Sequence, residues 1–165
     1  MSSLLVGVLS DTHGWLDAAV VQLFAGVDHI VHAGDIEDPA ILERLGALAP
    51  VTAVYGNCDG GRFPTLKEAE TVILGGVTVR VRHSVEMVEA LDAAILGAMR
   101  TAGAGVVIGG HTHRPSIEHR DGILFLNPGS ASLRRQGVQR SVALLQIEDG
   151  RCKAEIAELG WDVLL

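Results

Sequence analysis

The sequence has 165 residues, of which 48% are hydrophobic and 4% aromatic, and its formal net charge is −7. A chain of this length builds one domain around its own hydrophobic core, so we expect residues 1–165 to form a single domain. The composition excludes disordered, collagen-like and coiled-coil proteins. The acidic balance argues against a membrane surface or nucleic acid as a stable partner, because both attract basic proteins.

The cysteines and the hydrophobic pattern indicate a cytoplasmic protein. Cys58 and Cys152 are far apart and form no CxxC pair, which argues against a disulfide framework or a zinc ribbon. No apolar run approaches the roughly 18 residues of a membrane span. The first residues also lack the basic segment of a secretory signal.

The first third of the chain alternates between strand and helix patterns. The apolar run Leu4–Leu9 predicts a buried strand, which ends at the turn Ser10-Asp11-Thr12-His13-Gly14. The elements expected next are a helix over Trp15–Ala25, a strand over Ile30–Ala33, a helix over Pro39–Leu48 and a strand over Val51–Tyr55. Such alternation is typical of a mostly parallel sheet covered by helices.

The rest of the chain predicts a second sheet. Thr71–Leu74 and Val77–Val81 flank Gly75-Gly76, which indicates a hairpin. A helix is expected over Val85–Met99, with Val88, Leu91, Ile95 and Met99 facing the core. The remaining expected strands are Val106–Ile108, Ser116–His119, Ile123–Leu126, Val142–Ile147 and Cys152–Ala157. We therefore expect two sheets with helices outside.

Five of these strands end in residues that can bind a metal ion. Ligands of open α/β sheets bind at this edge, and residues i and i+2 of an extended segment point to the same side. Imidazole nitrogens mixed with carboxylate and amide oxygens suit Mn²⁺, Fe²⁺, Zn²⁺ or Ni²⁺, and are too rich in nitrogen for Ca²⁺ or Mg²⁺. The candidate metal ligands are Asp11, His13, Asp35, Asn57, His83, His111 and His113.

Seven ligands are too many for one tetrahedral ion and suit two ions that share a carboxylate. Asp35 stands alone between the paired motifs and is the expected shared ligand. Two divalent ions can clamp a phosphate ester and hold a hydroxide for in-line attack. The charges of the ions exceed those of Asp11, Asp35 and the hydroxide, so the centre attracts an anionic substrate within an acidic protein.

The order of these motifs resembles the signature of the calcineurin-like metallophosphoesterases, in particular the small single-domain phosphodiesterases of the YfcE type. Each motif is weak alone, but five in order, each after a predicted strand, form a specific pattern. The motifs are Asp11-Thr12-His13, Gly34-Asp35, Gly56-Asn57-Cys58-Asp59, His83 and Gly110-His111-Thr112-His113. The resemblance covers essentially the whole chain, including Asn127-Pro128-Gly129-Ser130.

The resemblance implies a four-layer α/β/β/α sandwich and an assignment of the ligands. One metal would take Asp11, His13, Asp35 and His113, and the other Asp35, Asn57, His83 and His111. The implied reaction is hydrolysis of a small phosphodiester by a hydroxide that bridges the ions, most readily Mn²⁺. Asp35, Asn57 and His111 are the expected catalytic residues, with Asn57 against the substrate phosphate.

Two positions depart from the family pattern. Cys58 stands where larger members carry a histidine that is thought to protonate the leaving group. A thiol with an ordinary pKa of about 8.5 replaces imidazole poorly near neutral pH, so we expect slow reaction of leaving groups that need a proton. Val85 stands where the small branch has a second histidine, after His83-Ser84, which predicts a changed substrate preference or rate.

Several alternatives stay open at this point. The protein could be a phosphoesterase-fold scaffold that binds protein partners without catalysis, or a phosphomonoesterase or nucleotidase. His32, Asp59 and Arg114 are either supporting residues of the site or ordinary strand, turn and surface residues. The apolar C-terminal residues predict self-association as a homo-oligomer if they are exposed; they are Trp161, Val163, Leu164 and Leu165.

Overall fold

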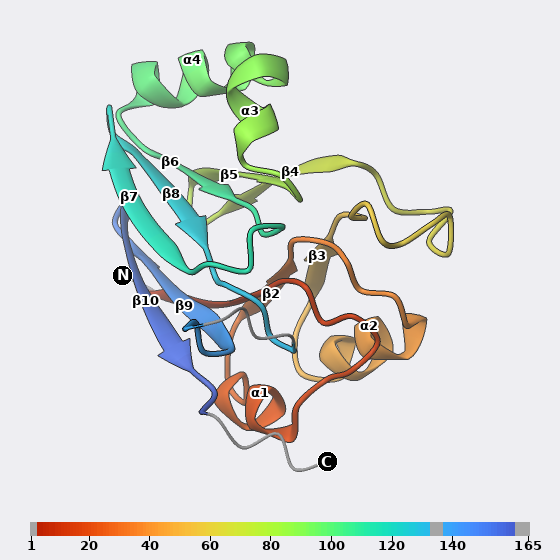
Figure 1. Ribbon diagram of the computed structural model, residues 1–165. Helices are drawn as coiled ribbons and strands as arrows, with labels where there is room; N and C mark the ends of the chain where they lie inside the picture. The colour runs from red at the N-terminus through yellow and green to blue at the C-terminus, as the bar shows by residue number, and fades with distance from the viewer. Residues whose placement is uncertain (1–2, 133–136, 161–165) are drawn as a thin grey trace.

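The structure, a computed structural model, describes residues 3–132 and 137–160 of the chain. Within these residues the strands form two five-stranded sheets, with the orders β10-β9-β1-β2-β3 and β4-β5-β6-β8-β7 (Figure 1). The strands of the first sheet are β1 (Leu4–Leu9), β2 (His29–His32), β3 (Val51–Ala53), β9 (Ser141–Glu148) and β10 (Arg151–Glu158). The strands of the second sheet are β4 (Ala69–Leu74), β5 (Val77–Arg82), β6 (Gly105–Ile108), β7 (Ser116–Arg120) and β8 (Ile123–Asn127). The helices are α1 (Ala18–Leu23), α2 (Pro39–Gly46), α3 (Glu86–Leu91) and α4 (Ala93–Ala102).

Both sheets are mixed. β1, β2 and β3 are parallel neighbours in the first sheet, and β5, β6 and β8 in the second. β9, β10, β4 and β7 join antiparallel. The predicted hairpin is confirmed: Leu74 pairs with Val77, and Gly75 and Gly76 have φ of 55° and 78°. Two successive positive φ values are what a two-residue turn of this kind requires, and glycine adopts them without strain.

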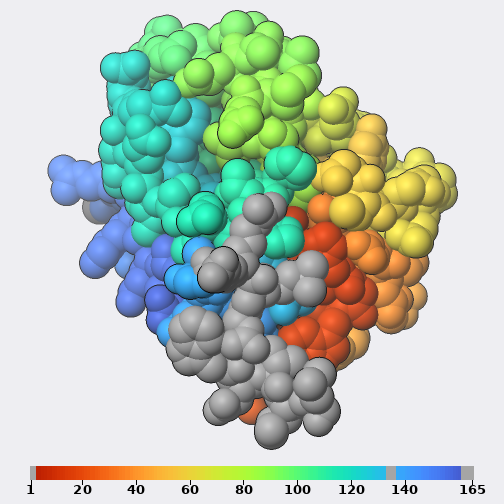
Figure 2. Space-filling view, in the orientation of Figure 1, coloured from red at the N-terminus to blue at the C-terminus, as the bar shows by residue number. Residues whose placement is uncertain are grey.

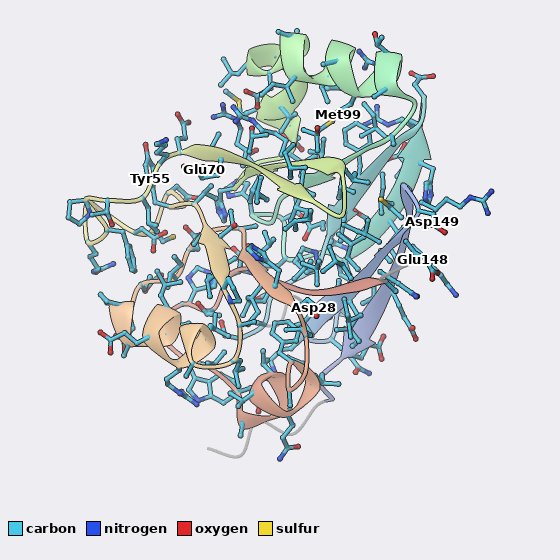
Figure 3. All side chains as sticks on the ribbon, turned by 180° about the vertical axis from the view of Figure 1, so that it is seen from behind. Asp28, Tyr55, Glu70, Met99, Glu148 and Asp149 are labelled. Atoms are coloured by element: carbon cyan, nitrogen blue, oxygen red, sulfur yellow. The ribbon has the colours of Figure 1, made fainter. Side chains whose placement is uncertain are left out.

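Three apolar clusters separate four layers. The largest lies between the two sheets and includes Val8, Val31, Val81 and Ile108. A second cluster packs α1 and α2 on the outer face of the first sheet, and a third packs α3 and α4 on the second sheet (Figure 1). Figure 3 shows the molecule from behind, with Met99 labelled at α4, where it is buried in the third cluster. The expected α/β/β/α sandwich is confirmed.

The first predicted helix is shorter than expected. α1 begins at Ala18 rather than near Trp15, because the Asp17 side chain accepts a hydrogen bond from the amide of Ala19 at 2.9 Å and caps the helix. Asp38 caps α2 in the same way, through the amide of Ala40. Pro39 begins α2, as its position in the sequence predicts.

The single helix predicted over Val85–Met99 is wrong, because the chain breaks at Asp92 into α3 and α4. The Asp92 carboxylate turns onto β5, where it accepts hydrogen bonds from Arg80 at 2.7 Å and Arg82 at 2.9 Å. This break changes the helical register, so Leu91 is 55% exposed instead of facing the core. Val88 and Met99 are buried as expected.

None of the helices in the described part of the chain is long and apolar enough to cross a membrane. The C-terminal apolar residues proposed for self-association, Trp161, Val163, Leu164 and Leu165, lie outside the described residues.

Candidate metal centre

Side chains that follow the ends of five strands meet at one edge of the two sheets. The seven predicted residues are Asp11 and His13 after β1, Asp35 after β2, Asn57 after β3, His83 after β5, and His111 and His113 after β6. In the space-filling view, the red surface of the segment after β1 lies beside the teal surface of the segment after β6 (Figure 2). Segments about 100 residues apart in sequence thus form one site.

The first group of ligands surrounds the Asp11 carboxylate. Its Oδ1 atom lies 3.2 Å from Nε2 of His113 and 3.7 Å from Nε2 of His13. The two Nε2 atoms are 3.3 Å apart. Asp11, His13 and His113 therefore present one oxygen and two nitrogens to a single point, and Asp11 is completely buried.

The second group contains Asp35 and His83. Nε2 of His83 lies 3.2 Å from Oδ2 of Asp35 and 4.0 Å from Oδ1 of Asp11. The same Oδ2 atom lies 4.0 Å from Nε2 of His13. Asp35 thus stands between the two groups, which is the position expected for a shared ligand.

Asn57 and His111 complete the cluster on its solvent side. Nδ1 of His111 lies 3.1 Å from Oδ1 of Asn57, and its ring centroid is 5.2 Å from that of His83. Both Asn57 and His111 are exposed. The cluster is therefore buried at the Asp11 end and open at the Asn57 end, where a substrate has access.

The expectation that paired ligands point to one place is confirmed for Asp11 and His13 but wrong for His111 and His113, and the extended backbone assumed for both pairs is wrong. The backbone is left-handed at Asp11 and His13 and again at His111 and His113, with φ between 45° and 72°. This conformation is uncommon for residues other than glycine and concentrates at functional sites. As a result Asp11 and His13 converge, whereas His111 turns to Asn57 and His113 turns to Asp11. Asp35 and Glu37 have positive φ as well.

Glu37 is a residue of this site that the sequence analysis missed. Its Oε1 atom lies 2.6 Å from Nδ1 of His13. Nδ1 of His83 similarly donates to the carbonyl oxygen of Ala33 at 2.7 Å. Such contacts fix the ring orientation and leave Nε2 free to bind a metal. The sequence holds no spacing signal that separates Glu37 from an ordinary acidic turn residue.

Asp59 organises the loop that carries Asp35. Its buried carboxylate accepts hydrogen bonds from the amides of Asp35, Ile36, Glu37 and Gly56, at 2.6–3.0 Å. Each carboxylate oxygen takes two of these amides. Of the roles left open for Asp59, the structure selects the organisation of this loop rather than a contact to Asn57.

His32 and Asn127 form hydrogen bonds with the segments that carry the candidate ligands. His32 is fully buried, and its ring bonds to the Thr12 hydroxyl and accepts from the amide of Gly34. Burial lowers its pKa to about 3, so the ring is neutral. Asn127 donates to the carbonyl oxygen of Gly110 at 3.0 Å. Arg114, in contrast, is exposed.

Two glycines allow the strand ends to approach this closely. A Cβ atom at Gly56 would collide with Oδ1 of Asp35, and one at Gly110 would collide with Oγ of Ser10 and Oδ2 of Asp11. Glycine at these two positions therefore permits the close backbone approach at the site.

The buried carboxylates and histidines shift each other's pKa. Burial alone would raise the pKa of Asp11, but the nearby imidazoles of His113 and His13 outweigh it and hold that pKa below its ordinary value. The Asp11 carboxylate, 3.7 Å from Nε2 of His13, raises the pKa of His13 to about 9. Burial acts to lower the pKa of His83, but the contact with Asp35 raises it. The carboxylates thus attract positive charge into the cluster.

The residues present fit divalent metal ions. Within the described residues, Oδ1 of Asp11 and Nε2 of His83 are buried without a hydrogen-bond partner, and they lie 4.0 Å apart. An unsatisfied buried polar atom costs about 1–3 kcal/mol, and a coordinated cation would satisfy both. The mixed imidazole and carboxylate donors suit Mn²⁺, Fe²⁺, Zn²⁺ or Ni²⁺. The role of the seven residues as metal ligands remains a prediction.

The two departures from the family pattern lie at the edge of the cluster. Cys58 is exposed, and its amide donates to Oδ1 of Asp35 at 2.8 Å. Partial burial of the thiol, together with Asp35, raises the pKa of Cys58 to about 11. Val85 packs against the apolar cluster under α3 and α4, so this position adds no polar group to the cluster.

Comparison with known proteins agrees with this geometry. Residues 4–150 match the calcineurin-like phosphoesterase superfamily domain. The chain is 37% identical to the "Probable metallophosphoesterase" of Methanocaldococcus jannaschii, over 89% of this chain and 78% of that protein. It is 32% identical to the phosphodiesterase YfcE of Escherichia coli, over 82% and 84% of the two chains.

A solved structure supports the same relationship. A predicted phosphoesterase from Streptococcus pneumoniae superposes with a TM-score of 0.73 at 27% identity, covering 96% of this chain and 91% of the other. The sequence match, the two mixed sheets and the cluster at their edge all point to one family. The chain belongs to the calcineurin-like phosphoesterase superfamily.

Proposed function

We propose that the protein is a phosphodiesterase that depends on two divalent metal ions, with Mn²⁺ as the preferred ion. The observation that carries this proposal is the convergence of Asp11, His13, Asp35, His83 and His113, with two buried donor atoms left without partners. A scaffold needs no such arrangement of unpartnered donors. The acidic chain, with net charge −7, favours a small phosphodiester over a nucleic acid polymer.

The residues have distinct roles in this proposal. Asp11, His13 and His113 would hold one ion, Asn57, His83 and His111 would hold the other, and Asp35 would serve as the shared ligand. When bound, two such ions supply Lewis acidity and an activated water for in-line attack on phosphorus. Glu37 and the carbonyl oxygen of Ala33 keep the rings of His13 and His83 oriented with Nε2 toward the cluster. Asn57, exposed beside His111, is placed to donate its amide to a phosphate oxygen.

The decisive variant is Asp35→Asn, because it changes the shared carboxylate with little change in volume. Asp38→Asn is a matched control, since Asp38 lies three positions away and caps α2 at the surface. We expect about two Mn²⁺ per wild-type chain and turnover of bis(4-nitrophenyl) phosphate that is lost on metal removal and restored by Mn²⁺. Asp35→Asn should lower metal content and reduce turnover at least 100-fold, while its circular dichroism spectrum matches the wild type.

Three results would contradict the proposal. Wild-type turnover by metal-stripped Asp35→Asn protein would exclude the two-metal mechanism. Faster turnover of 4-nitrophenyl phosphate than of the diester would favour a phosphomonoesterase. Absence of both bound metal and turnover after addition of Mn²⁺ would favour the scaffold.

A further inference from the structure

A pocket lies beside the exposed end of the candidate metal centre. It has a volume of about 240 Å³, and Asn57, His83 and His111 form one side of it. Tyr55 and Met87 line it as well. Pockets that hold drug-sized ligands typically measure about 300–1,000 Å³, so this pocket has room for one ring system and not for a polymer.

Tyr55 and Met87 give the pocket an apolar and aromatic wall. Tyr55 is 40% exposed and Met87 is 44% exposed, although both are large hydrophobic side chains. The amide of Tyr55 donates to the carbonyl oxygen of Lys67 at 3.1 Å, which anchors this residue directly before Gly56 and Asn57. Figure 3 shows Tyr55 in the segment that leads from β3 to β4. An aromatic face and a thioether both pack favourably against a planar ring.

The charged residues of the pocket disfavour a second anionic group. Arg82 is buried, and its guanidinium donates to Asp92 at 2.9 Å and 3.2 Å. Its remaining Nη1 atom faces Oε1 of Glu68 at 3.3 Å. Arg82 is thus already neutralised by two carboxylates, and Glu68 is exposed at the pocket. Asp92 also pairs with Arg80, so two arginines balance two carboxylates here. A substrate arm that enters this pocket therefore meets apolar walls and no excess positive charge.

We propose that this pocket binds one uncharged planar ring, aryl or nucleobase, of the phosphodiester substrate, with Tyr55 as the residue that determines specificity. The inference rests on the proposed function, since the scissile phosphate has to lie at Asn57 and His111 for the ring-bearing ester group of the substrate to reach Tyr55. The substrate class is accordingly a diester whose negative charge is confined to the scissile phosphate and which carries at least one flat ring.

The test compares two phosphonates by isothermal titration with the Mn²⁺-loaded protein. Phenylphosphonate and methylphosphonate carry the same anionic group and differ in the ring. We expect the wild type to bind phenylphosphonate about tenfold tighter, and Tyr55→Ala or Met87→Ala to reduce that preference about three- to tenfold. Tyr55→Phe should retain the preference. Ile73→Ala, a control on β4 that removes a 61% exposed hydrophobic side chain away from the pocket, should change nothing.

The outcomes separate this inference from the proposed function. Equal binding of the two phosphonates by the wild type, an unchanged preference in Tyr55→Ala, or no binding of either compound would overturn it. Bound Mn²⁺ without diester turnover would refute the proposed function, while the titration would still decide whether the pocket binds a ring. Competition by adenosine 5′-monophosphate distinguishes the two ring types. If this nucleotide binds more tightly than phenylphosphonate, and if Glu68→Gln weakens its binding, the pocket binds a nucleobase.

Discussion

Substitution of Asp59 by asparagine should destabilise the whole candidate site, although Asp59 itself is not among the predicted metal ligands. The buried carboxylate holds the amides of Ile36 and Glu37 on Oδ1 and those of Asp35 and Gly56 on Oδ2. Asparagine has a single side-chain oxygen, so in either orientation it can accept only two of these four amides. The other two amides would face an NH₂ group and lose their acceptor.

The magnitude follows from the two lost bonds. A hydrogen bond to a charged acceptor contributes about 1.5–3 kcal/mol, so the loss of two should reduce the free energy of unfolding by about 3–6 kcal/mol. Domains are typically stable by about 5–15 kcal/mol. For a chain of this size each kcal/mol lowers Tm by about 2–4 °C, which predicts a decrease of about 6–24 °C.

Urea unfolding in the presence of a chelator measures this effect without a contribution from bound metal. Asp38→Asn is the matched control, because Asp38 accepts one exposed amide, that of Ala40, and asparagine caps a helix as well as aspartate does. We expect the control to change the unfolding free energy by less than about 0.5 kcal/mol. If the two variants differ by less than about 1 kcal/mol, the role assigned to Asp59 is wrong.

Two further predictions concern pH and the leaving group. The nearby Asp11 carboxylate raises the pKa of His13 to about 9. Because a metal binds the neutral ring, affinity for Mn²⁺ should increase from pH 7 to about 9 with release of a proton, as titration calorimetry in two buffers would show. The same raised pKa stabilises the metal-free fold below pH 6.5, and this contribution is lost as pH rises through about 9. Thermal melts of the chelated protein measure it. A gain in stability from this group between pH 6.5 and about 9 would contradict the assignment. Cys58, whose thiol pKa is raised to about 11 by partial burial, donates a proton poorly at neutral pH. Cys58→His should therefore increase turnover by about tenfold or more for poor leaving groups such as phenolate, and an equal increase for 4-nitrophenolate would refute this account.

The local pattern of the sequence was sufficient for most elements of the fold. Apolar runs that end in glycine and polar residues located β1, β2 and β6, and Gly75-Gly76 located the hairpin. The helix break at Asp92 could not be predicted this way. It depends on Arg80 and Arg82 of β5, which donate hydrogen bonds to the Asp92 carboxylate. The resulting break leaves Leu91 exposed.

The supporting residues of the site, unlike its candidate ligands, could not be predicted from the local sequence pattern either. Glu37 and Asp59 act through contacts to residues 22–24 positions away, and no spacing rule distinguishes them from ordinary acidic turn residues. Tyr55 and Met87 are 32 positions apart in sequence and share a pocket. Their pairing is visible only once β3 and the start of α3 are placed in space.

The sequence alone determined the family, the two mixed sheets and the seven candidate ligands, because strand periodicity and the motifs at strand ends are local properties of the chain. Only the tertiary structure decided which residues orient those ligands and how closely the candidate ligands approach one another. Those features depend on distances of 3–4 Å between side chains up to about 100 residues apart. Such distances are set by the packing of two sheets and by left-handed backbone at Asp11, His13, His111 and His113, which the local pattern of residues does not encode.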